Sequence, residues 1–361
     1  MKSSLIAILF LHLFVVAANA QTQDQLIAGA KSEGRLVLYA SAATQQLQMY
    51  MAAFNKRYPF VKTEYFRTDK QKLVTRVLLE EQTKQRIADL IHTSVIETHI
   101  LKKRGALSRY VPAESASYPS QYKDPEGYWT SVYASGTLMG FNTQQVKRAE
   151  APKTYEDLLN PRWKNNLGID NTKIEWFSML LKLKGRSFME KLAAQNPRVY
   201  AGNTNALNLL AAGEFPIMPG VYEYSVDSLK TKGAPVDWIG LEPVITYTVA
   251  VSLPSNPPHP FAAKLFAEWL LTKEGQEVIN QYGRVPIRDD IDSRYGKILK
   301  QHKLLMTDVD PQPARGRSER NDPQAVSMRG MSSTSIPLAA VIPNVREGSF
   351  RKDSSSFRSS E

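Results

Sequence analysis

The sequence contains no cysteine, and this absence excludes three kinds of structure. A chain without cysteine has no disulfide framework, no thiolate metal centre and no cysteine nucleophile. Histidine is scarce as well: there are five, and a predicted strand end separates the nearest pair, His92 and His99. Glycine-rich phosphate loops and the signature motifs of zinc proteases and serine hydrolases are also missing. We therefore expect neither enzyme activity nor a resident cofactor.

Long apolar runs are confined to the start of the chain. Met1 and Lys2 form a short basic beginning, residues 5–17 are almost wholly apolar, and residues 18–20 read Ala-Asn-Ala. This is the layout of a cleaved secretory signal peptide over residues 1–20, with an apolar run too short to span a bilayer comfortably. Because no cysteine follows the cleavage site, a lipid-anchored form is excluded. We expect an exported, periplasmic protein.

Positive charge is in excess but is not concentrated in one place. The 361 residues include 46 Lys and Arg against 35 Asp and Glu, a net charge of +11. In the folded part these charges alternate in sign along predicted helices, without the basic stripe and interleaved aromatics of nucleic-acid-binding proteins. The charge favours attraction of small anions and excludes nucleic acid as a partner. Residues 311–361 are rich in Ser, Arg and Pro, lack periodicity and are predicted to be a disordered tail.

Apolar periodicity predicts an α/β fold. Strands are expected over residues 34–41, 60–67 and 88–94, with helices after each of them. Such alternation with short connections is typical of a parallel sheet covered by helices. A second unit follows, with predicted strands at 167–170, 215–218 and 236–241 and helices at 176–183, 188–194 and 203–212. Thr154 and Asp157 have the spacing of a capping box that opens a further helix. Two β stretches, 131–142 and 242–253, lie between the units, and helices at 261–272 and 273–282 end the folded part.

The simplest topology returns these last helices to the first unit. The fold class is therefore α/β, with two Rossmann-like lobes joined by a two-strand hinge. Lobe 1 is expected to contain residues 21–132 and 247–310, and lobe 2 residues 133–246.

The carboxyl ends of the three predicted parallel strands carry Ser41, Arg67 and Ser94. Ligands of open parallel sheets bind beyond these ends. Both serines precede helices, whose N-termini attract anions, and Arg67 offers a planar fork for carboxylate or phosphate. The sequence therefore predicts an anion site here. The alternatives are that both serines are ordinary helix caps and that Arg67 forms a surface ion pair.

The second unit offers further candidate ligand-binding residues. Asn203 opens a predicted helix, and Tyr222 and Tyr224 follow a predicted strand that ends at a Pro-Gly turn. The tyrosines can donate hydrogen bonds to a ligand or, as phenolates, hold a hard metal; the alternative is one packed and one exposed ring. Tyr133, near the crossover, either lines the cleft or packs in the hinge.

The chain resembles the extracellular solute-binding proteins of ABC importers, in the branch that includes ferric-ion-binding proteins. The similarity spans about residues 25–291. The segments that carry it are 34–41, 72–76, Ala88-Asp-Leu-Ile-His-Thr-Ser94, 155–164, 208–215 and 260–276. The resemblance implies the architecture of a type II periplasmic binding protein and delivery of a small ligand to a membrane permease. Ferric-binding members use adjacent tyrosines near the position of Tyr222, whereas here Glu223 separates Tyr222 from Tyr224.

These observations lead to one principal hypothesis. The protein binds a small anion, or ferric iron with a synergistic anion, between its lobes, and acts as a monomer. The ligand residues are expected to be Ser41, Arg67, Ser94, Tyr133, Asn203, Tyr222 and Tyr224, with Tyr222 and Tyr224 as the metal ligands if the cargo is iron. A ligand-sensing domain and an exported enzyme on the same scaffold are the alternatives.

Overall fold

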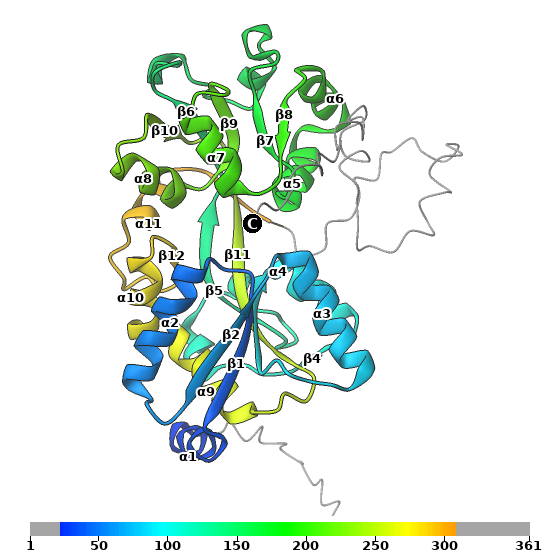
Figure 1. Ribbon diagram of the computed structural model, residues 1–361, viewed down its shortest axis with the longest axis vertical. Coiled ribbons are helices and arrows are strands. Elements are labelled where there is room, and N and C mark those ends of the chain that lie inside the picture. The colour runs from blue at the N-terminus through cyan, green and yellow to red at the C-terminus, as the bar shows by residue number, and fades with distance from the viewer. Residues whose placement is uncertain (1–21, 308–361) are drawn as a thin grey trace, which may run out of the picture.

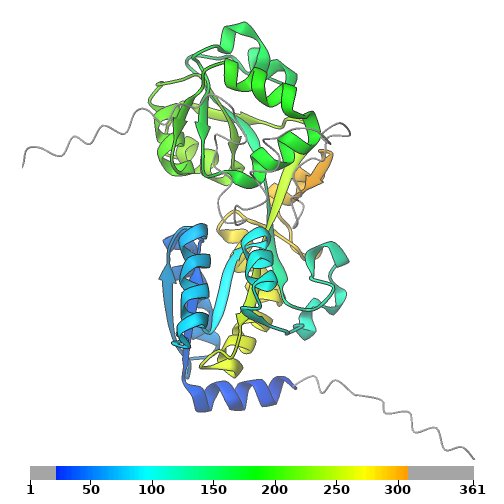
Figure 2. The ribbon, with the colours of Figure 1, turned by 90° about the vertical axis from the view of Figure 1, so that its right-hand side faces the viewer.

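The computed structural model describes residues 22–307. The predicted signal peptide and the tail over 311–361 lie outside the described residues. Figures 1 and 2 show two bodies, one built around an eight-stranded sheet and the other around the strands β6 to β10. We call them the first and the second lobe. Two extended segments, β5 and β11, rise from the first lobe toward the second (Figure 1).

The strands are β1 (Arg35–Ala40), β2 (Lys62–Arg67), β3 (Leu90–Ser94), β4 (Leu107–Ser108), β5 (Thr130–Gly136), β6 (Leu138–Asn142), β7 (Gly168–Asp170), β8 (Arg198–Tyr200), β9 (Ile217–Val221), β10 (Val236–Ile239), β11 (Val244–Pro254), β12 (Val285–Pro286) and β13 (Leu304–Met306). The α-helices are α1 (Gln23–Glu33), α2 (Thr44–Arg57), α3 (Lys70–Thr83), α4 (Val95–Lys103), α5 (Ile174–Lys184), α6 (Arg186–Ala194), α7 (Asn203–Ala211), α8 (Glu223–Thr231), α9 (Pro260–Leu271), α10 (Lys273–Gln281) and α11 (Arg294–Leu299).

The first lobe contains the parallel strands expected from the sequence. β1 pairs in parallel with β2 and with β3, while β11 and β5 continue the sheet in the antiparallel sense. The order of the sheet is β12-β5-β11-β3-β1-β2. Because β1, β2 and β3 run in the same direction, their carboxyl ends meet at one edge, where Ala40 pairs with both Arg67 and His92.

The second lobe is built on two short sheets. β10, β6 and β9 form an antiparallel sheet, and β7 pairs in parallel with β8. A parallel bridge between Leu167 and Ile217 joins the two groups of strands. α7 begins three residues after β8, and α8 begins two residues after β9, so both helix N-termini lie close to strand ends.

The chain passes between the lobes at the β5–β6 and β10–β11 connections. The two crossings are tied together, because the Thr137 amide donates to the Ile245 carbonyl at 2.8 Å. The last described segment takes a course that the sequence did not predict. α9 and α10 return to the first lobe, but Tyr295 on α11 donates its hydroxyl to Asp227 on α8 at 2.9 Å. β13 pairs in parallel with the start of β11.

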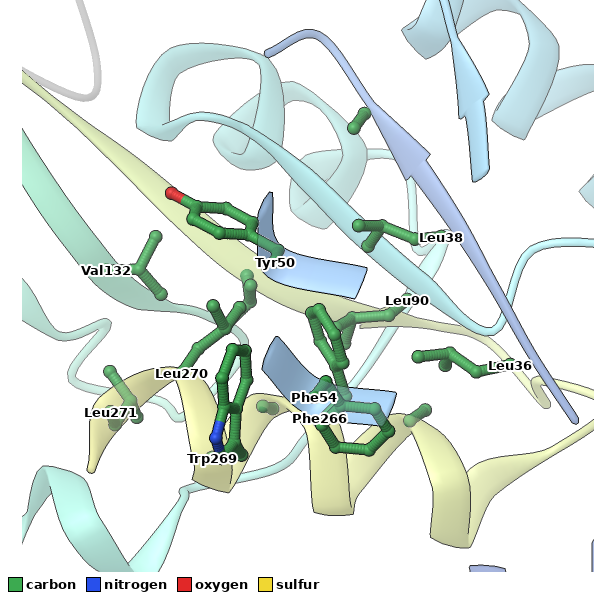
Figure 3. Close-up of a cluster of buried hydrophobic side chains, with 14 of the residues drawn as sticks. Leu36, Leu38, Tyr50, Phe54, Leu90, Val132, Phe266, Trp269, Leu270 and Leu271 are labelled. Carbon is green, nitrogen blue, oxygen red and sulfur yellow. The ribbon is translucent and has the colours of Figure 1, made fainter. Parts of the chain in front are cut away.

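The largest core of the first lobe lies between α2, α9 and the sheet (Figure 3). Phe54 on α2 packs edge-on against Phe266 and Trp269 of α9, with ring centroids 4.8 and 5.5 Å apart. All three rings are buried. Leu47, Met51 and Phe54, whose helical spacing predicted α2, thus lie on the face of α2 that this core buries.

Three local predictions were wrong or incomplete. Thr154 and Asp157 do exchange capping hydrogen bonds, but they open a 3-10 turn over Glu156–Leu159 rather than an α-helix. The expected turn at Pro219 and Gly220 lies inside β9, where the register shifts and Gly220 adopts a φ of 81°. α1 was not predicted, although a Thr22 capping box and Gly34 at its end mark it.

Candidate functional site

Ser41 and Ser94 lie at the same edge of the first lobe, and neither side chain makes the capping hydrogen bond that was the alternative to an anion contact. The N-cap of α2 is Ala43, and the Ser41 hydroxyl instead lies 3.0 Å from that of Thr93. Ser94 is the N-cap of α4, yet its hydroxyl donates to the carboxylate of Glu97 rather than accepting from the backbone. The amide groups at the start of α4 are therefore not covered by the side chain of Ser94.

Arg67 ends β2 beside these serines and is exposed. Its Nε donates to the Ala42 carbonyl at 3.4 Å. Among residues 22–307 no carboxylate lies within 4.0 Å of Arg67, so the surface ion pair considered above does not form in this part of the chain. The guanidinium stands at the carboxyl ends of the parallel strands, where the sequence predicted an anion contact.

Four of the tyrosines gather around one buried arginine where the lobes meet. Arg284, which follows α10, is only 4% exposed, and its guanidinium carbon lies 3.8 Å from the ring centre of Tyr224. The ring centres of Tyr133 and Tyr282 lie 5.0 and 5.6 Å from it. Tyr222 stacks on Tyr224 with an interplanar angle of 14° and a centroid distance of 5.7 Å. The structure therefore brings Tyr133 together with Tyr222 and Tyr224, which lie far from it in the sequence.

Arg284 has hydrogen bonds but no acidic partner. Its Nε and one terminal nitrogen both donate to Gln46 Oε1 at 3.2 Å, and the other terminal nitrogen is 3.5 Å from Ser135 Oγ. Within residues 22–307 no carboxylate lies within ion-pairing distance of it. Gln46 is itself fully buried. A buried guanidinium held by neutral groups keeps its full positive charge available to a ligand.

Lys173 is the second buried cation of this region. It precedes α5 in the second lobe, is 4% exposed, and its Nζ lies 2.9 Å from the ring centre of Tyr222. That ammonium has no hydrogen-bond acceptor among the described residues. Burial lowers its pKa to about 7, although the charges of Asp170 and Glu175 act in the opposite direction.

Glu223 lies between the two tyrosines and is also buried, at 1% exposure. Neither carboxyl oxygen has a hydrogen-bond partner within residues 22–307. Burial raises the pKa of this carboxyl to about 7, and the positive charges of Arg284 and Lys173 moderate the increase. Asn203 begins α7, and its buried Oδ1 is likewise unpartnered in the described chain.

An ion pair between a partly exposed lysine and a buried glutamate joins the two lobes beside this cluster. Lys70, the first residue of α3, donates its ammonium to Glu175 on α5 of the second lobe. Burial favours the neutral form of each group, but the mutual attraction outweighs it, raising the pKa of Lys70 and lowering that of Glu175. Glu97 of the first lobe lies close enough for its charge to act on both.

The groups that the sequence analysis missed are the charged ones: Arg284, Lys173, Glu223, Lys70 and Glu175. Glu223 was visible only as the residue that interrupts the tyrosine pair. The other four stand in ordinary mixed-sign segments, where no motif distinguishes a buried charge from an exposed one. The sequence carried no signal that would have identified them.

The donor set fits a hard metal only through its tyrosines. No group of three or more His, Asp or Glu side chains that could hold a metal occurs in the described chain. Burial raises the pKa of the Tyr222 phenol well above its ordinary range, and neighbouring Tyr247 adds to this. Tyr222 is thus a neutral hydrogen-bond donor unless a cation displaces its proton.

None of the helices described over residues 22–307 has the length and apolar character needed to span a membrane.

Comparison with known proteins identifies the family. The family model of bacterial extracellular solute-binding proteins matches residues 87–310. The Fe(3+)-binding periplasmic protein of Serratia marcescens is 28% identical over 183 residues, which cover 46% of this chain and 53% of that protein.

Two solved structures have the same fold. Iron-bound HitA from Pseudomonas aeruginosa matches with a TM-score of 0.66 and 18% identity, over 72% of this chain and 88% of its own. AfuA from Actinobacillus pleuropneumoniae, with exogenous fructose-6-phosphate bound, matches with a TM-score of 0.66 and 20% identity, over 75% of this chain and 91% of its own. The expected two-lobed α/β fold of a type II periplasmic binding protein is confirmed. The match over residues 87–310 places this chain in the family of bacterial extracellular solute-binding proteins.

Proposed function

We propose that this protein captures a small anionic solute between its two lobes and delivers it to the membrane permease of an ABC importer. The observation that carries the proposal is the pair of buried cations without acidic partners, Arg284 from the first lobe and Lys173 from the second. An anion between them supplies the direct ionic contact that neither cation has in the described chain, where Asp170 and Glu175 act on Lys173 only from beyond hydrogen-bonding distance.

The energetics of Lys173 support this assignment. Keeping an ammonium charged at a site where its pKa has dropped from 10.5 to about 7 costs about 5 kcal/mol, at about 1.4 kcal/mol per pKa unit. Coulombic attraction to a bound anion offsets this cost in the complex alone, so it favours binding. Arg284 differs from Lys173: burial favours its neutral form, but the surrounding tyrosines outweigh burial and raise its pKa well above the ordinary range, so its guanidinium remains charged at every physiological pH.

The remaining contacts come from residues that the sequence analysis selected. Tyr133, Tyr222 and Tyr224 surround the cations and can donate hydroxyl protons to ligand oxygens. Arg67 and the start of α4 lie at the carboxyl ends of the strands, and Ser41 and Ser94 lie between them. We propose that the two lobes, expected over residues 21–132 with 247–310 and over residues 133–246, close on the solute, with β5 and the contact between α11 and α8 at the boundary between them.

The cellular role follows from the family and the amino terminus. We propose export through a cleaved signal peptide over residues 1–20, a periplasmic location and a monomeric state. The protein binds without chemical turnover, and the permease is its macromolecular partner.

The substitution Lys173→Met tests the proposal because it changes affinity and stability in opposite directions. Removing a buried, unpaired ammonium stabilises the ligand-free protein, whereas binding of the anion weakens at least tenfold. Native mass spectrometry of the protein purified from the periplasm identifies a co-purified anion. Calorimetry with that anion, or with phosphate, sulfate, citrate and glycerol 3-phosphate, then gives the affinities.

The matched control is Lys191→Met, at an exposed lysine on α6. It should leave both the affinity and the midpoint of thermal unfolding unchanged. Unaltered affinity in Lys173→Met, or the failure of every small anion to bind the wild type, would refute the assignment of the anion site.

A second candidate cargo is ferric iron held with the anion. It is favoured by the stacked pair Tyr222 and Tyr224 beside Arg284, and the Serratia marcescens relative is named as Fe(3+)-binding. Phenolate ligation of ferric iron would give a visible charge-transfer band in the purified protein. Loss of that band in both Tyr222→Phe and Tyr224→Phe would establish iron as the cargo, and a colourless protein loaded with an organic anion would exclude it.

A further inference from the structure

We infer that the solute is an anion that also carries hydrogen-bond donors, either hydroxyl or amino groups. This inference rests on the proposed function and specifies the class of anion. It is drawn from the acceptor atoms of the second lobe that remain unpartnered around Lys173.

Three side chains supply these acceptors. Asp170 at the end of β7 and Glu223 at the start of α8 are 2% and 1% exposed. Asp170 Oδ2 and both carboxyl oxygens of Glu223 have no partner within residues 22–307, and the same is true of Asn203 Oδ1. Buried polar atoms in folded proteins are nearly always hydrogen-bonded, so four such acceptors in one region call for donors from outside the chain.

The contacts show that these acceptors belong to a single site. Asp170 Oδ1 accepts from the Gly202 amide at 3.0 Å, which holds the end of β7 against Asn203, the first residue of α7. Lys173 follows Asp170 by three residues, and its ammonium faces the ring of Tyr222, the neighbour of Glu223. Lys173 is therefore close both to the end of β7 and to the segment Tyr222–Glu223 at the start of α8.

Hydrogen bonds to one oxygen of Asp170 hold its carboxylate in place. Asp170 Oδ1 takes three hydrogen bonds, from the Thr172 amide at 3.0 Å, the Thr172 hydroxyl at 2.7 Å and the Gly202 amide. The carboxylate is thereby held in one orientation while Oδ2 stays unpartnered. A carboxylate held in one orientation, with its second oxygen unpartnered, is suited to recognise a hydrogen-bond donor at a defined position.

The same region holds cations and acceptors. Arg284 lies against Tyr224 and Gln46, and Lys173 lies in the second lobe with Asp170 and Asn203. A bare oxyanion offers only acceptors, so it can bind the cations but leaves the oxygens of Asp170, Glu223 and Asn203 unpartnered. A solute that carries an anionic group together with hydroxyl or amino groups satisfies both sets.

Matched pairs of probes test this inference by calorimetry. Glycerol 3-phosphate is compared with propyl phosphate, glycerate with propionate, and O-phosphoethanolamine with ethyl phosphate. Within each pair the charged group is the same and only the donors differ. At least one donor-bearing member should bind ten times or more tightly than its partner, because a site built to bond a hydroxyl or amino group rejects the analogue that lacks it. The first two pairs report hydroxyl recognition and the third reports amino recognition.

The variants Glu223→Met and Asn203→Ala then locate the discrimination. Each should reduce the preference within the favoured pair by several fold while changing the affinity for the donor-free member little. Glu190→Gln, at an exposed glutamate of α6, serves as the control and should keep the full preference.

The outcomes separate this inference from the proposed function. If both members of every pair bind equally well, the inference is wrong and the anion site stands. If no anion binds at all, the proposed function fails first. A visible iron band that is lost in Glu223→Met would show that the carboxylate binds metal, and would also overturn the inference.

Discussion

Replacement of Glu223 by glutamine should change how the stability of the ligand-free protein depends on pH. Burial raises the pKa of this carboxyl from 4.5 to about 7, so the folded state binds its proton more tightly than the unfolded chain. Stability from this group is therefore complete below about pH 4.5. It is lost as the pH rises toward 7, where the native carboxylate ionises. Glutamine carries no titratable proton and shows no such loss.

The size of the effect follows from the two pKa values. Between pH 5 and pH 8, the wild type should lose about 2–3 kcal/mol of unfolding free energy relative to Glu223→Gln, at about 1.4 kcal/mol per pKa unit. Urea denaturation followed by tryptophan fluorescence at several pH values measures both proteins, since the chain has five tryptophans. The difference between the two curves, rather than either curve alone, isolates Glu223.

Glu190→Gln provides the control, because this glutamate is exposed on α6. Its curve should run parallel to that of the wild type. Parallel curves for Glu223→Gln as well would mean that Glu223 ionises at the same pH in the folded and unfolded states. Burial would then not raise the pKa of Glu223, and this carboxyl would not be a buried, unpartnered acceptor.

Three further changes test the packing and the contact between the lobes. Phe54→Ala should cost about 3–5 kcal/mol in urea denaturation, because it opens a cavity against Trp269 in a close-packed core. Gly275→Ala should destabilise the protein by about 1–3 kcal/mol, since the new Cβ would lie 2.2 Å from the Trp269 carbonyl oxygen; unchanged stability would refute the backbone contact. Lys70→Met should cost about 3–5 kcal/mol by leaving Glu175 buried without its partner, and the double variant Lys70→Met with Glu175→Met should recover most of that loss. No recovery would show that the two residues act independently.

Much of the fold could be predicted because its signals are local. Leu47, Met51 and Phe54 recur at the helical spacing that α2 requires, and the apolar residues of β1 make a buried strand recognisable. The predictions failed where local signals agree with more than one structure. The capping hydrogen bonds between Thr154 and Asp157 are compatible both with the start of an α-helix and with a 3-10 turn. Pro219 and Gly220 are typical of turns, but a strand that carries a bulge accommodates them too.

The candidate site was predicted only in part. The direction of three parallel strands was enough to bring Ser41, Arg67 and Ser94 to one edge, since the carboxyl ends of parallel strands coincide. The hydrogen bonds of the two serines could not be predicted, because the side chains that they bond are brought close only by the tertiary structure. Ser94 donates to Glu97 rather than capping α4, and this depends on the burial of Glu97.

The sequence by itself determined the alternation of strands and helices, the two units and the resemblance to solute-binding proteins. These properties depend on residue order and periodicity, which are readable along the chain. Only the tertiary structure decided which charges are paired. Lys70 finds Glu175 across 105 positions, whereas Arg284 reaches Gln46 across 238 positions and meets no carboxylate among the described residues. Pairing and burial are set by contacts between distant segments, so the cations and acceptors of the candidate site become visible only when the two lobes come together.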